Sequence, residues 1–129
     1  MIMGYISDEL GKQIKSSNEK VNQYDADLEA CNQAMADAEK AKAIFDKASK
    51  QMGNLIVETG VVFQGFAEAA FVSKLATHNK AVIVMGVVME KRIADLKKRI
   101  KEIEGQKFWC QVWTNILTGL MNTFKFFAL

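Results

Sequence analysis

The sequence contains no proline among its 129 residues, although average usage would supply about six in a chain of this length. Proline costs roughly 3 kcal/mol inside a helix and is common in loops and linkers. Its absence argues against a loop-rich sandwich, a polyproline linker or a Pro-punctuated α/β enzyme, and it favours long uninterrupted helices. Half of the residues are hydrophobic, which is too large a share for an intrinsically disordered chain.

Residues that carry chemistry are also scarce, with two cysteines and one histidine. Two cysteines exclude a disulfide-rich scaffold and a Cys-based zinc site, and one histidine excludes a His cluster. The motifs G-x-x-x-x-G-K-[ST], G-x-G-x-x-G, H-E-x-x-H and C-x-x-C do not occur. We therefore expect a protein that is not an enzyme and that uses no metal, no other cofactor and no small-molecule substrate.

A long helix is predicted over about 7–52. Ser7, followed by Asp8 and Glu9, is a favourable helix start. Apolar side chains then recur at alternating spacings of three and four residues, which is typical of a coiled-coil seam. The seam residues that we expect to form an interface are Ile14, Val21, Tyr24, Leu28, Met35 and Phe45, with Cys31 on the same line. Ser17 and Lys42 are polar residues on this seam, and Gly53-Asn54 predicts the end of the helix.

The middle of the chain predicts two further helices. Residues 55–76 are apolar and glycine-rich and are expected to be helical, and Thr77-His78-Asn79 is an expected turn that explains the single histidine. A helix over about 80–104 carries a second seam. Its members are Ile93, Leu96, Ile100 and Ile103. Gly105 either ends this helix or lets it continue through about 106–127.

The last 22 residues combine a wide apolar face with a polar stripe. The apolar face consists of Trp109, Trp113, Ile116, Leu117, Leu120, Phe124 and Phe127. The polar stripe consists of Gln111, Asn115, Thr118, Asn122 and Lys125. Together with the long seam, this face is more apolar surface than one small monomer buries easily. It is therefore expected to be an interface between chains or a surface that contacts a membrane.

These patterns predict an all-α fold with a single helical domain over 1–129, either an elongated helical hairpin or a coiled-coil bundle of three or four helices. In a hairpin bent near residue 70, Cys31 and Cys110 would lie at the same level, where a disulfide is geometrically conceivable. The same register would place Lys40–Lys50 against the basic stretch 91–101. The acidic stretch 25–39 would suit that basic stretch better and favours a stagger, for example between subunits. The sequence alone leaves the two registers open.

The function that these features favour is self-assembly of a non-enzymatic structural protein, such as a filament or secretion-apparatus subunit. The alternatives are a membrane-active pore or translocator that inserts 108–129 or 55–89, and a helical chaperone or adaptor. The expected partners are further copies of the chain, other helical proteins and a membrane, but no nucleic acid, because the net charge is only +2 and the basic stretch lacks interleaved aromatics.

The N-terminal residues show no cleavable signal, so we expect a cytoplasmic protein or one that is exported by a dedicated secretion system, with a membrane association left open. At the level of general pattern, the chain resembles small helical substrates of specialised bacterial secretion systems. It lacks a W-x-G element, because Trp109 is followed by Cys-Gln and Trp113 by Thr-Asn.

Overall fold

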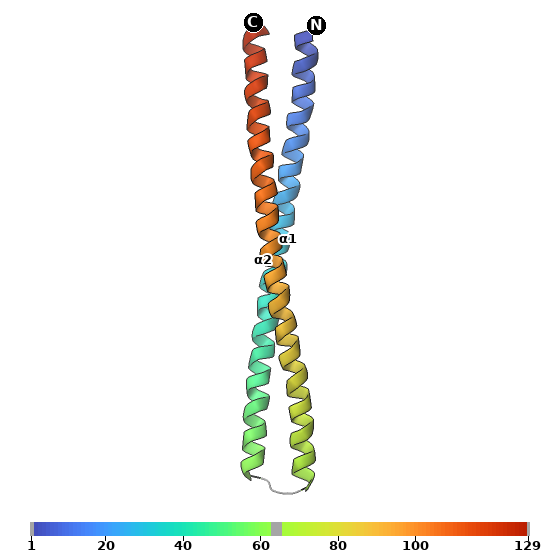
Figure 1. The fold of residues 1–129 in the computed structure, drawn as a ribbon, viewed down its shortest axis with the longest axis vertical. Helices are drawn as coiled ribbons and strands as arrows, with labels where there is room; N and C mark the ends of the chain where they lie inside the picture. Colours follow the sequence, from blue (N-terminus) through green and yellow to red (C-terminus); the bar gives the residue numbers. More distant parts are fainter. Residues whose placement is uncertain (1, 63–65, 129) are drawn as a thin grey trace. The chain divides into compact units, whose positions relative to one another are not determined.

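The fold is all-α and consists of two long helices that pack against each other as a helical hairpin (Figure 1). A computed structural model describes residues 2–62 and 66–128, with the side chains of 3, 60–62, 66–68 and 128 left aside. Helix α1 spans Ile2–Val62 and helix α2 spans Phe66–Ala128. The all-α prediction is confirmed, and of the two predicted architectures the described residues form the hairpin.

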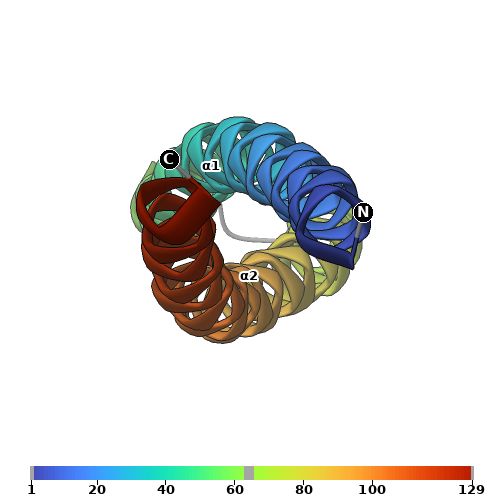
Figure 2. The ribbon, with the colours of Figure 1, turned by 90° about the horizontal axis from the view of Figure 1, so that it is seen from above.

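The chain divides into two compact units, each of which contains a segment of both helices. Unit 1 consists of Met1–Asn32 and Lys98–Leu129, and unit 2 consists of Gln33–Lys97. In each unit the α1 and α2 segments lie side by side and wind around each other in a left-handed sense (Figure 2). A strict seven-residue repeat produces this handedness, because it is shorter than two full turns of a straight α-helix.

The heptad pattern runs through both helices. On α1 one line of side chains, at alternating spacings of three and four, is buried or partly buried along its whole length. This line contains Leu10, Ile14, Ser17, Val21, Tyr24, Leu28, Cys31, Met35, Ala38, Lys42, Phe45, Ser49, Met52, Ile56 and Thr59. The corresponding line on α2 contains Val72, Leu75, Asn79, Val82, Gly86, Met89, Ile93, Leu96, Ile100, Ile103, Lys107, Cys110, Thr114, Leu117, Met121 and Phe124. We call these two lines the seam.

Three predicted helix boundaries are wrong. Helix α1 begins at Ile2 rather than near Ser7, and it continues through Gly53-Asn54 instead of ending there. Helix α2 passes without a break through Thr77-His78-Asn79. The seam explains the last two, because Met52, Ile56 and Asn79 are all partly buried members of it. Packing along a seam outweighs the cost of about 1 kcal/mol for a helical glycine. Gly105 also lies inside α2, so the continuous helix over 80–104 and 106–127 is the alternative that occurs.

The register between the helices differs from the one that a bend near residue 70 would give. In unit 1, Gly11 lies opposite Met121, and in unit 2, Gly86 lies opposite Phe45 and Asp46. Residue 70 lies inside a helix and not at a bend, because α1 ends at Val62 and α2 begins at Phe66. Cys110 therefore meets Ser17 rather than Cys31, and both cysteines are free.

Candidate functional site

The most distinctive property of the described residues is how little of their apolar surface the hairpin buries. Among the side chains that the structure describes, only three apolar ones, those of Ala38, Ile103 and Leu117, are buried. Eighteen large apolar side chains are exposed. Two antiparallel helices offer each other one seam, so every apolar residue outside the seam remains in contact with solvent. Exposed apolar surface on this scale indicates association with a protein partner or self-association.

The predicted seam residues occupy the contact between α1 and α2 within one chain. Each of these ten side chains is at least partly shielded from solvent. They are Ile14, Val21, Tyr24, Leu28, Met35, Phe45, Ile93, Leu96, Ile100 and Ile103. Their heptad spacing predicts an interface, and in the structure they line the contact between the two helices of one chain. The apolar residues that remain for a partner therefore lie elsewhere.

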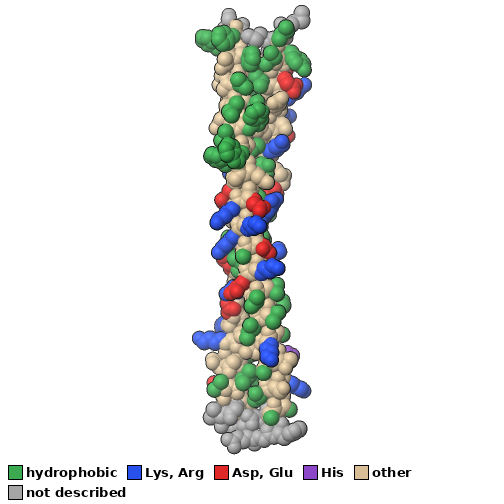
Figure 3. Space-filling view, viewed as in Figure 1, with side chains coloured by type: hydrophobic (Ala, Val, Ile, Leu, Met, Phe, Trp, Pro, Cys, Tyr) green, Lys and Arg blue, Asp and Glu red, His purple; other side chains and the backbone are tan. Residues whose placement is uncertain are grey.

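In unit 1 five of these residues form a second heptad line on α2, which flanks the seam. Trp109, Trp113, Ile116, Leu120 and Phe127 are exposed by 69%, 51%, 49%, 45% and 70%. Their spacings of four, three, four and seven residues place them on one helical face. We call these five residues the α2 strip. Figure 3 shows hydrophobic side chains gathered over this part of α2.

Two residues of the predicted apolar face do not belong to the strip. Leu117 is only 2% exposed and Phe124 is half-buried, because both are seam positions that point towards α1. The prediction that Leu117 is part of an exposed face is therefore wrong. The predicted polar stripe of Gln111, Asn115, Thr118, Asn122 and Lys125 is exposed throughout.

A polar layer interrupts the seam of unit 1 next to the strip. The Ser17 hydroxyl is buried, contacts the Thr114 hydroxyl at 2.5 Å, and lies 3.4 Å from the Cys110 thiol. Thr114 donates in turn to the Cys110 carbonyl oxygen at 2.9 Å. These contacts satisfy the hydroxyl groups inside an otherwise apolar contact and favour one register, since a slipped helix would leave them unpaired. The heptad pattern places Ser17 on the seam, but its partners Cys110 and Thr114 depend on the register between the helices.

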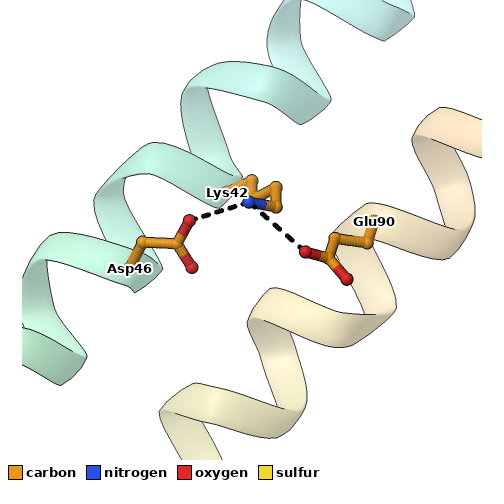
Figure 4. A network of polar contacts seen from close by, with 3 residues as sticks. All are labelled: Lys42, Asp46 and Glu90. Atoms are coloured by element: carbon orange, nitrogen blue, oxygen red, sulfur yellow. Dashed lines mark hydrogen bonds and ion pairs between the residues drawn. The ribbon is translucent and has the colours of Figure 1, made fainter.

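A second polar group occupies the seam of unit 2. The Lys42 ammonium group donates to Asp46 at 2.8 Å and lies 3.4 Å from Glu90 on α2 (Figure 4). The hydrogen bond and charge of Asp46, and then those of Glu90, raise the pKa of Lys42 above its usual range. In unit 1, Lys107 pairs with Asp25 at 2.5 Å. Basic and acidic side chains thus face each other across the hairpin, within one chain.

Neither a metal site nor a membrane-spanning segment is found among the described residues. Within 2–62 and 66–128, no three His, Cys, Asp or Glu side chains gather as ligands for a metal ion. Over the same ranges, neither helix contains a segment that is both long and apolar enough to cross a membrane. Comparison with protein-family models, with curated proteins and with solved structures finds no match for this chain.

Proposed function

We propose that this protein is a non-enzymatic structural subunit that assembles with further copies of itself, as in a filament or a secretion apparatus. The α2 strip is the observation that carries the proposal. Its 4-3-4 spacing is that of a coiled-coil seam, yet no helix of the same chain covers it. A helix that presents one seam inside its hairpin and another outside it is suited to packing between neighbours.

The composition of the strip favours a protein surface as its partner. Three of its five members are aromatic, and no residue from Phe108 to Phe124 carries a formal charge. Aromatic residues are enriched and charged residues depleted at the centres of protein interfaces. With aromatic side chains burying ~150–250 Å² each, the strip offers on the order of 600 Å² of apolar area. That is close to the roughly 800 Å² that each partner contributes to a standard interface.

The direct test is the mass of the purified protein, measured by light scattering and sedimentation across a concentration series. We expect oligomers in the absence of lipid, and extended particles by negative-stain microscopy. Replacing Trp113 and Leu120 with glutamine keeps the helix propensity and removes two central members of the strip. We expect this double variant to form smaller particles than the wild type at equal concentration.

A matched control replaces Asn115 and Asn122 with glutamine, because these residues lie on the exposed polar stripe of the same helix. This control should assemble like the wild type. A wild-type protein that stays monomeric at every concentration would contradict the proposal. Dye leakage from liposomes, together with a monomer in water, would favour the membrane alternative instead.

A further inference from the structure

Unit 2 contains an open groove of about 300 Å³ that lies outside the α2 strip. Ala34, Asp37, Ala38 and Ala41 line it from α1, and Met89 and Arg92 line it from α2. On each helix the spacings of three and four residues place the lining residues on one face. The groove is therefore the surface of a two-helix layer, open to solvent along one side.

The two sides of this groove differ in size. The α1 side consists of three alanines and Asp37, so small side chains predominate on it. The α2 side carries larger residues, and one turn further Met85 and Val88 continue the same face with exposures of 43% and 48%. Small residues on one helix and large residues on the other are complementary when the two faces are brought together.

The two sides also carry opposite charges. Asp37 on α1 and Arg92 on α2 are both exposed. The Asp37 carboxylate accepts a hydrogen bond from the Gln33 amide at 3.1 Å. Within residues 2–62 and 66–128, Arg92 lies within ion-pair distance of no carboxylate, so its charge is available to a partner.

We propose that this face binds the same face of a second copy of the chain, related by a two-fold axis parallel to the helices. That symmetry places α1 of one copy against α2 of the other. The alanines of each copy then pack against Met89 and Val88 of the other copy. Asp37 of each copy lies near Arg92 of the other, so the pair of chains contains two equivalent Asp37–Arg92 contacts. An isologous contact of this kind is self-complementary in both size and charge.

The proposal rests on the self-association proposed above and adds a second interface to it. We call the lining of the groove, together with Met85 and Val88, the groove face. With one contact surface on the α2 strip and another on the groove face, each chain would contact two different neighbours. Such a chain forms assemblies that extend beyond a pair. Loss of either surface should then leave a discrete small oligomer, and loss of both should leave a monomer.

The test uses charge reversals in the Trp113→Gln, Leu120→Gln background, in which the groove face is the remaining proposed contact. Asp37→Lys and Arg92→Asp, each alone, place like charges opposite each other in the pair, and we expect dissociation constants at least tenfold higher than that of the parent. An equimolar mixture of the two variants should associate again, because lysine 37 of one chain then faces aspartate 92 of the other, and Arg92 faces Asp37. An ion pair within one chain cannot explain this rescue.

Val88→Glu and Val87→Glu provide a second, matched comparison. Each new glutamate lies four residues before a basic residue, Arg92 or Lys91, but only Val88 belongs to the groove face. We expect Val88→Glu to weaken association at least tenfold and Val87→Glu to change it less than twofold, with equal helicity by circular dichroism. A monomeric double-glutamine parent would overturn the groove interface, as would single reversals that associate like the parent. A wild type that never assembles contradicts the proposed function itself, so the two failures are distinguishable.

Discussion

Leu117 and Trp113 lie one helical turn apart on α2, but their side chains have opposite surroundings. Leu117 is 2% exposed and belongs to the seam, whereas Trp113 is 51% exposed and belongs to the α2 strip. Substitutions at the two positions should therefore separate folding from assembly. Such a separation is valuable in a chain with so few buried residues.

Leu117→Asp should destabilise the hairpin itself. The change buries an unpaired carboxylate and removes one of the most deeply buried apolar side chains of the seam. We expect a cost of about 3 kcal/mol or more in the free energy of unfolding. Thr118→Asp is the control, because Thr118 is exposed on the neighbouring position. Chemical denaturation followed by circular dichroism measures both. Equal stability of the two variants would contradict the placement of Leu117 in the seam.

Lys42 gives the hairpin a dependence on alkaline pH. Because its pKa is raised in the folded state, the stabilisation from Lys42 is complete below the ordinary lysine pKa of about 10.4 and is lost as the pH rises through the raised value. We expect the difference in Tm between the wild type and Lys42→Met to be constant at neutral pH and to shift in favour of Lys42→Met above about pH 11. A difference that does not depend on pH would show that the ammonium charge contributes nothing.

At the scale of the helices, the seam was predictable from the sequence, and the helix ends were not. The heptad spacing of residues such as Ile14 and Ile100 is a local property, so periodicity alone finds it. Gly53 and Asn79 carry local signals for a stop and a turn. Asn79 lies on the seam and Gly53 directly follows its member Met52, so packing with the opposite helix outweighs these signals. That packing depends on the register, which a pattern within one helix does not contain.

The helical glycines permit a test of this explanation. Gly53 and Gly105 have negative φ. Apart from their chain neighbours and the backbone of their own helical turns, no described atom lies within 4 Å of the place where a Cβ would be added. Gly53→Ala and Gly105→Ala should each raise the free energy of unfolding by roughly 0.5–1 kcal/mol, through the lower entropy of the unfolded chain. Gly86→Ala should gain less, because its added Cβ would lie 3.4 Å from an Asp46 oxygen. Denaturation midpoints of the three variants give the comparison. A loss of stability in Gly53→Ala would mean that the helix does not continue there.

The sequence shows which residues of the candidate site are apolar. Which of them contact the opposite helix depends on the register between α1 and α2, and the sequence does not give that register. The amphipathic pattern of 108–129 identified Trp109, Trp113, Ile116, Leu120 and Phe127, all of which are exposed in the structure. It could not assign Leu117 to the other side, because a helix that is apolar around most of its circumference does not reveal which line contacts α1. The groove face of unit 2 was missed for another reason. Its α1 side consists mostly of alanines, which give no signal in a sequence and line a groove only where α2 lies beside them.

At the scale of the whole molecule, the balance of buried and exposed apolar residues points to association. Three buried apolar side chains form a very small core, whereas eighteen large ones are exposed over the described residues. A domain with so small a core gains little from folding alone. Assembly would bury the remaining apolar side chains, so folding and association are expected to be coupled. The apparent Tm should therefore rise with protein concentration.

The polar layer around Ser17 has a practical consequence for kinetic experiments. Cys110 is a free thiol, partly buried, whose sulfur lies 3.4 Å from the Ser17 hydroxyl. An alkylating reagent attacks the exposed thiolate, so modification of Cys110 should require local separation of the helices in unit 1. The alkylation rate of this native thiol can therefore serve as a measure of helix opening. In a Cys31→Ser background, the rate of alkylation at Cys110 would report how often the open ends of the two helices come apart, with no label added.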